Sequence, residues 1–177
     1  MAEAVVALTR EDIRRLFDLL NAELASQGVE GEIYLVGGAV MCLVLDARLA
    51  TRDVDAFFRP AKAIREAAAR VAARTGVSEG WLNDAVKGFL SPQGDFEPYL
   101  ELSNLRVFAA RPEYLLAMKC ASMRFGEEFS DLEDVRYLLR YLNISTAEEA
   151  LDLVTRYFDE KNLPPKSRFA LEELLPR

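Results

Sequence analysis

Two short apolar segments on either side of a glycine pair constrain this chain more than any other feature. The run Ile-Tyr-Leu-Val at 33–36 has the length of a buried strand, and it stops at Gly37-Gly38. An apolar segment of helical length follows over 39–45, and the sequence predicts a second strand over 51–58. The stretch 33–58 therefore supplies two strands with a glycine turn and a helix between them.

The second of these strands carries two carboxylates, Asp53 and Asp55. Because side chains alternate along a strand, we expect both carboxylates to point to the same face of the sheet. Two adjacent carboxylates repel each other unless a cation lies between them. Mg²⁺ is the simplest such cation, since it prefers oxygen ligands and is bound by one or two carboxylates together with substrate phosphates. The pair therefore predicts a site for one or two Mg²⁺ ions.

The glycine pair predicts a second half to this site. Gly37 and Gly38 offer backbone N–H groups with no side chain in the way, and a helix N-terminus behind them favours an anion. We therefore expect a phosphate cradle beside the metal site. The structural alternative is that Asp53 is a surface residue paired with an arginine and that Asp55 only ends a strand.

Gly-Gly followed by Asp-x-Asp on the next strand resembles the signature of the DNA polymerase β-type nucleotidyltransferase superfamily. The pattern Arg48…Thr51-x-Asp53-x-Asp55 is similar, more narrowly, to that of small bacterial AbiEii-like nucleotidyltransferases, some of which are toxins of toxin–antitoxin pairs. The resemblance implies a nucleoside triphosphate as substrate, Mg²⁺ held by the two acids, and a cognate antitoxin as a candidate partner. From this stretch, the candidates for contact with the nucleotide are Gly37, Gly38, Arg48, Thr51 and Arg52. Thr51 either binds a phosphate or only favours the strand, and the two arginines either bind phosphate or pair with the acids when no nucleotide is present.

A later helix extends the resemblance. In AbiEii-like proteins a helix with Lys, Ala and Arg precedes an Asp-rich helix start, and here Lys119 and Arg124 precede Asp131. The resemblance implies that Lys119 contacts the triphosphate and that Arg124 and Asp131 complete the site. From the residues alone, Lys119 can extend its head to water. Asp131 can equally be a first-turn acid of a helix capped by Ser130.

The superfamily usually carries a third carboxylate on a later strand, and its identity here is open. The sequence predicts a turn over 91–98 and strands over 99–102 and 105–109. The candidates are Glu101 on the first of these strands, Asp95 and Glu97 in the turn before it, and Asp131 or Asp134 in the later helix.

Composition narrows the chemistry. The 177-residue sequence contains no histidine, which excludes Ser-His-Asp and Cys-His catalysis and histidine-ligated zinc. A net charge of −7 argues against a protein whose whole surface binds nucleic acid. Cys42 and Cys120 lie in apolar segments and are expected to be reduced core thiols. With no signal-peptide pattern and no apolar run of membrane-spanning length, we expect a soluble cytoplasmic protein without a membrane partner.

The rest of the sequence predicts helices. Thr9 caps an amphipathic helix that ends near Gly28, and an Ala/Arg-rich helix occupies 61–74. The basic residues of the second helix form either a solvated face or a contact with a phosphate backbone. They are Lys62, Arg65, Arg70 and Arg74.

The expected fold is α+β. A small mixed sheet with flanking helices occupies 1–110, and a helical portion over 111–177 packs on it as one continuous structural unit. The expected function is Mg²⁺-dependent transfer of a nucleoside monophosphate from an NTP to a hydroxyl of an RNA, such as a tRNA, or of a protein. The alternative is a non-catalytic nucleotide-binding or protein-interaction module on the same fold.

Overall fold

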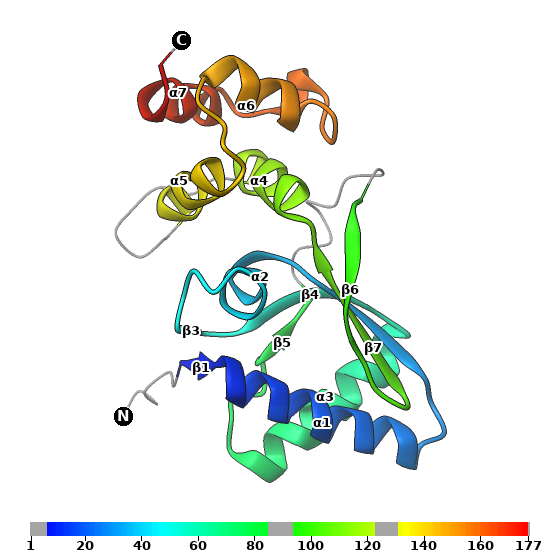
Figure 1. Ribbon diagram of the computed structural model, residues 1–177. Coiled ribbons are helices and arrows are strands. Elements are labelled where there is room, and N and C mark those ends of the chain that lie inside the picture. Colours follow the sequence, from blue (N-terminus) through cyan, green and yellow to red (C-terminus); the bar gives the residue numbers. More distant parts are fainter. Residues whose placement is uncertain (1–6, 85–93, 123–130, 177) are drawn as a thin grey trace. The chain divides into compact units, whose positions relative to one another are not determined.

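The computed structural model describes residues 7–84, 94–122 and 131–176, and the chain divides into two compact units (Figure 1). Unit 1 comprises residues 1–87 and 96–109, and unit 2 comprises residues 88–95 and 110–177. Unit 1 contains a mixed sheet flanked by helices, and the described part of unit 2 is mostly helical. The fold is therefore α+β, as the sequence predicts.

Unit 1 is built around a five-stranded sheet. Its strand order is β5-β4-β2-β7-β6, with β4 antiparallel to β2 and with the pairs β2–β7 and β4–β5 parallel. A separate two-stranded pair joins β1 to β3. The elements are β1 (Leu8–Thr9), α1 (Arg10–Ser26), β2 (Gly31–Leu35), α2 (Gly37–Leu43), β3 (Ala50–Thr51), β4 (Val54–Arg59), α3 (Ala61–Thr75), β5 (Leu82–Asn83), β6 (Phe96–Glu101) and β7 (Leu105–Ala110).

Helices α1 and α3 lie side by side against one face of this sheet (Figure 1). Helix α1 begins with a capping box between Thr9 and Asp12, which satisfies two backbone N–H groups that the helix leaves unpaired. A Cβ added to Gly31 on β2 would lie 2.9 Å from a side-chain carbon of Ile64 on α3 and 3.2 Å from one of Leu24 on α1. The face to which Gly31 points is therefore the one that the two helices cover.

The strand register separates two faces of the sheet, which we call the covered face and the opposite face. Since Gly31 points to the helices, alternation places Ile33 and Leu35 with it, and the register adds Phe58 and Ala56 from β4. All four are at most 2% exposed. Burial of one large aliphatic side chain such as Ile33 or Leu35 contributes about 1.5–3 kcal/mol to the free energy of folding. The opposite face carries Glu32, Tyr34, Asp55, Phe57, Arg59, Arg106 and Phe108.

An aromatic and ionic cluster joins the central strands on the opposite face. The Tyr34 ring stacks on Phe108 at 4.9 Å between centroids and meets Phe96 edge-on at 5.1 Å. The Tyr34 hydroxyl donates to Glu32 at 3.0 Å, and Arg59 Nε donates to the same carboxylate at 3.1 Å. Although burial acts to raise it, these two hydrogen bonds hold the pKa of Glu32 below its usual value. The cluster ties β2, β4 and β7 together beside Asp55.

The predicted strand over 51–58 is wrong in its first half. Residues Ala50–Thr51 form β3, which pairs with β1 outside the main sheet, and β4 begins only at Val54. The Thr51 hydroxyl donates to the carbonyl of Asp53 at 3.1 Å and so stabilises a bend between the two strands. Asp53 therefore lies in this bend and not on the strand that carries Asp55.

Strand β6 corrects a second prediction. It begins at Phe96, so Glu97 and Pro98 belong to a strand and not to the turn expected over 91–98. Proline is tolerated here because β6 is an edge strand, where one missing N–H leaves no neighbouring strand unpaired.

The described part of unit 2 contains α4 (Pro112–Ala121), α5 (Asp131–Tyr141), α6 (Ala147–Val154), the 3₁₀ helix η2 (Glu160–Asn162) and α7 (Pro165–Leu174). Asp95 Oδ2 accepts a hydrogen bond from the Tyr157 hydroxyl at 3.1 Å, and Oδ1 forms an ion pair with Arg111 Nε at 3.1 Å. Burial and the Asp95 carboxylate raise the pKa of Tyr157 to about 12. Ser130, the predicted cap of α5, lies outside the described residues. Within the described ranges, every helix is too short or too polar to cross a membrane.

Candidate functional site

The glycine turn that follows β2 brings together the polar residues of unit 1. Gly37 has a φ of 63°, in the left-handed region where a side chain is disfavoured, so the turn needs glycine at this position. Helix α2 begins here but spans only seven residues. We therefore describe the site by the side chains around the turn and not by the helix terminus.

Asp55 lies directly against the first glycine. A Cβ added to Gly37 would sit 3.2 Å from Oδ2 of Asp55. The backbone fixes this approach, because the Val36 N–H donates to the Asp55 carbonyl at 3.0 Å. Asp55 is half-buried. The absence of a side chain at Gly37 thus lets the Asp55 carboxylate, whose backbone is set by the sheet, approach the turn closely.

Arg48 and Thr51 lie against the second glycine. A Cβ added to Gly38 would be 2.9 Å from Nη1 of Arg48 and 2.9 Å from Oγ1 of Thr51. Arg48 is half-buried and Thr51 is buried. The turn therefore has a carboxylate beside one glycine, and a guanidinium and a hydroxyl beside the next.

The loop that carries Arg48 is fixed at its start. Arg10 on α1 forms an ion pair with Asp46 at 3.1 Å. The Ala47 N–H donates to the Met41 carbonyl at 2.8 Å, so the chain turns back along α2 before it reaches Arg48. The exposed Arg52 follows in the bend after β3.

The two acids of this stretch, Asp53 in the bend and Asp55 on β4, are residues of the type that binds Mg²⁺. Asp53 and Asp55 supply carboxylate oxygens, the ligands that Mg²⁺ prefers, and both side chains are half-buried. The space before Asp55 is one that a Cβ at Gly37 would fill. Among the residues that the structure describes, no group of three Asp, Glu or Cys side chains could hold a metal ion.

The sheet order separates Glu97 and Glu101, two of the candidates for the third carboxylate, from Asp55. Glu101 is exposed at the end of β6, which is three strands from β4 in the sheet. At about 4.8 Å between neighbouring strands, that spacing is about 14 Å. Glu97 lies on the same strand, and the Asp95 carboxylate is bound to Tyr157 and Arg111 in unit 2. None of these three acids is adjacent to Asp55 along the sheet.

Lys119, Asp131 and Asp134 come together within unit 2. Lys119 Nζ is 3.0 Å from Oδ1 of Asp131 and 2.9 Å from Oδ2 of Asp134. The lysine side chain is 11% exposed and each aspartate side chain 4%. The expectation that Lys119 extends its head to water is therefore wrong, because its ammonium is buried between two carboxylates. Arg124 lies outside the described residues.

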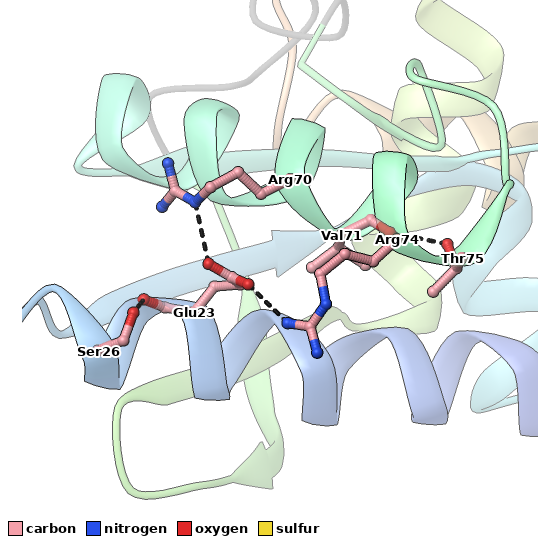
Figure 2. A network of polar contacts seen from close by, with 6 residues as sticks. All are labelled: Glu23, Ser26, Arg70, Val71, Arg74 and Thr75. Atoms are coloured by element: carbon pink, nitrogen blue, oxygen red, sulfur yellow. Dashed lines mark hydrogen bonds and ion pairs between the residues drawn. The ribbon is translucent and has the colours of Figure 1, made fainter.

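The basic residues of α3 are largely paired with carboxylates. The carboxylate of Glu23 on α1 forms ion pairs with Arg70 at 2.9 Å and with Arg74 at 2.7 Å (Figure 2). Arg65 forms an ion pair with Asp84 at 2.7 Å. The hydrogen bonds from Arg70 and then Arg74 hold the pKa of Glu23 below its usual value. This pairing favours the interpretation of α3 as a solvated, ion-paired face over contact with a phosphate backbone.

Sequence reasoning missed Asn83. Strand β5 pairs with β4 in parallel, and Asn83 lies in register with Asp55. The signal was available in part, because the apolar pair Trp81-Leu82 follows a helix that itself follows β4, the order of a parallel crossover unit. A strand of two residues is too short for an alternating pattern to reveal it.

Comparison of the chain with family models, with curated proteins and with solved structures gave no match. The functional interpretation therefore rests on the residues and their geometry.

Proposed function

We propose that the protein is an Mg²⁺-dependent nucleotidyltransferase that moves a nucleoside monophosphate from a nucleoside triphosphate to a hydroxyl group. The acceptor hydroxyl belongs to an RNA, such as a tRNA, or to a protein. In this proposal the substrate phosphates bind at the glycine turn.

One observation carries the proposal: an acidic side chain lies against the first of two consecutive glycines, and a basic side chain lies against the second. Oδ2 of Asp55 lies 3.2 Å from a Cβ added to Gly37, and Nη1 of Arg48 lies 2.9 Å from one added to Gly38. A nucleotide phosphate bound with Mg²⁺ needs carboxylates toward the metal and cationic or hydrogen-bonding groups toward its oxygens. The turn offers both kinds of group against two consecutive residues that have no side chains of their own.

The residues would have distinct tasks. Asp53 and Asp55 would hold Mg²⁺, which when bound neutralises the charge that develops on the phosphate oxygens. Arg48 and Thr51 would orient the phosphates. The acceptor oxygen then forms a bond to the α-phosphorus while the bond from that phosphorus to the bridging oxygen breaks. Pyrophosphate leaves with the electron pair, and the hydroxyl proton passes to solvent. Positioning and electrostatics supply most of such a rate enhancement, which suits a sequence without histidine.

The proposal does not depend on Lys119. Its ammonium is committed to Asp131 and Asp134 at 2.9–3.0 Å. Contact between Lys119 and the triphosphate, which the family resemblance implies, would require a phosphate to compete with two buried carboxylates. The residues that carry the proposal all lie in unit 1.

Incubation with each α-phosphate-labelled NTP, Mg²⁺ and total tRNA tests this function. The inactive variant is Asp53→Ala/Asp55→Ala. Glu101→Ala is the matched control, since it also removes a carboxylate from unit 1 but from a strand distant from β4.

We expect wild type and Glu101→Ala to transfer label from at least one NTP and the double variant to transfer none. If tRNA is not labelled, the same reactions are repeated with cell protein as acceptor. Mg²⁺-dependent NTP binding without transfer to either acceptor would favour the non-catalytic nucleotide-binding module instead. Transfer by the double variant at the wild-type rate would contradict the proposed site.

A further inference from the structure

We propose that Asn83 is the third side chain of the Asp53–Asp55 metal site, with its carboxamide oxygen as a neutral ligand of the same divalent cation. This inference rests on the proposed function, because it concerns the cation that the two acids would hold.

The register of the sheet puts Asn83 beside Asp55. Strands β4 and β5 run parallel, with Val54 opposite Leu82 and Asp55 opposite Asn83. Residues that are partners in a ladder point to the same face and are next to each other across one strand spacing, about 4.8 Å. The Val54 N–H donates to the Trp81 carbonyl at 2.6 Å, which fixes this alignment at its start.

The two faces of the sheet confirm which way these residues point. Val54 and Leu82 form the preceding pair, and both are buried, as expected on the covered face. The next pair must point to the opposite face, which is the face of Asp55 and Phe57. Asn83 is half-buried there.

Asp84, the neighbouring acid, is engaged elsewhere. Its carboxylate accepts a hydrogen bond from Arg65 of α3 at 2.7 Å. Of the two polar residues that end this segment, the amide therefore lies beside Asp55, while the acid binds a helix of the covered face. A search for a third carboxylate by residue type passes over this position, because the residue in register is an asparagine.

A buried tryptophan anchors the short strand that presents Asn83. Trp81 is 1% exposed, its Nε1 donates to the Ala68 carbonyl at 3.1 Å, and its ring lies 6.5 Å from that of Phe17. This anchoring explains how a strand of two residues can hold a ligand in a fixed place.

An amide at this position has a clear chemical consequence. Carbonyl oxygens suit Mg²⁺ and Mn²⁺ as carboxylates do, but they carry no charge. The donor set Asp53, Asp55 and Asn83 then has a charge of about −2 and not −3, which lessens repulsion between ligands and lowers affinity for the free cation. Oxygens from the nucleotide phosphates would complete the coordination.

Mn²⁺ binding to the full-length chain, measured by electron paramagnetic resonance without nucleotide, tests this assignment. If Asn83 is a ligand, Asn83→Asp adds a charge to the donor set and should tighten Mn²⁺ binding about tenfold. Asn83→Ala should weaken it several-fold. Asp84→Asn is the matched control, because it changes the charge at the next residue, and it should leave the affinity within about twofold.

The loss of affinity in Asn83→Ala reports on the amide oxygen, because the added charge of Asn83→Asp attracts a nearby cation even without coordination. Weaker Mn²⁺ binding in Asn83→Asp would overturn the proposal, as would unchanged binding in Asn83→Ala. If Asn83→Asp does not fold, unchanged binding in Asn83→Ala and Asn83→Ser would overturn it. Binding that is lost in Asp55→Asn but insensitive to Asn83 would refute this inference alone. No Mn²⁺ binding by the folded wild type, with or without NTP, would refute the proposed function as well.

Discussion

Each unit places aspartate and basic side chains close together, but in different surroundings. In unit 2, Asp131 and Asp134 bind the same buried ammonium of Lys119, and each aspartate side chain is 4% exposed. In unit 1, the half-buried Asp55 lies against Gly37 and the half-buried Arg48 lies against Gly38. The first arrangement neutralises charge inside the protein. The second places an acidic and a basic side chain directly against the backbone of two consecutive glycines.

Residue type alone does not distinguish a stabilising cluster from a binding site. Both groups of residues contribute to the sequence resemblance to nucleotidyltransferases. Burial and the glycine contacts distinguish them, because removing one partner of a buried ion cluster leaves an uncompensated charge, whereas a half-exposed site remains hydrated. We therefore expect substitutions in unit 2 to reduce stability and substitutions at the turn to reduce binding.

The largest expected effect is that of Lys119→Met. It removes the ammonium while keeping similar volume, so two buried carboxylates face each other, and we expect the free energy of unfolding to fall by about 3–5 kcal/mol. Urea unfolding measures the change, with Lys161→Met on the exposed η2 as the control for the substitution itself. Adding Asp131→Asn and Asp134→Asn should restore much of the loss. A loss below about 1 kcal/mol in Lys119→Met would show that this cluster is not a stabilising one.

Asp55→Asn should have the second largest effect, and it should act on binding. The substitution keeps the size of the side chain but removes its charge, so Mg²⁺-dependent NTP affinity should fall by about 100-fold or more. The free energy of unfolding should change by less than about 1 kcal/mol. Titration calorimetry and urea unfolding on the same samples measure both. A stability loss as large as that of Lys119→Met would contradict the assignment of Asp55 to binding and of Lys119 to stability.

Gly37→Ala tests whether metal binding needs a glycine at the turn, with Gly28→Ala as its control. Both glycines have positive φ, 63° and 66°, so each substitution should cost about 1–2 kcal/mol of stability through backbone strain. Only at Gly37 would the new Cβ meet Asp55, whereas at Gly28 nothing lies within 4 Å. We expect Mn²⁺ affinity to fall about tenfold in Gly37→Ala alone. Equal affinities in the two variants would mean that the space at Gly37 is not used.

The smallest effect is expected at the ion pairs between α1 and α3. The pKa of Glu23 is lowered by Arg70 and Arg74, so its ionised form stabilises the folded state. This contribution is fully present above the usual value of 4.5 and is lost as the pH falls through the lower folded-state pKa. Glu23→Gln should therefore cost about 0.5–1 kcal/mol at pH 7 and much less near pH 2. Urea unfolding at both pH values checks this, and an equal loss at both would contradict the assigned charge effect.

The sequence predicted the elements of unit 1 well where an apolar periodicity extends over many residues, as it does in the two long helices. The amphipathic stripe of α1 and the helix after Pro60 are both observed. The strand over 51–58 was predicted as continuous because polar and apolar residues alternate over 53–56 and an apolar run follows. The bend at Asp53 depends on a hydrogen bond from Thr51 and on pairing with β1, which comes from a distant part of the chain.

The candidate site was predictable only in part, for a related reason. Gly37, Gly38 and Asp55 are close in sequence, so a local motif suffices to group them. The alignment of Asn83 with Asp55 depends on a parallel pairing across a helix, which no local pattern encodes. Burial of Lys119 between α4 and α5 likewise follows from packing that is not visible in either helix alone.

The most direct test of the account measures NTP binding and stability together. Each of the four Mg²⁺-loaded NTPs is titrated by calorimetry into wild type and into Asp55→Asn, and urea unfolding curves are recorded on both proteins. The account predicts that at least one NTP binds wild type, that Asp55→Asn loses this binding, and that the two unfolding curves agree within about 1 kcal/mol. Equal NTP binding by both proteins, or none by the folded wild type, would contradict it.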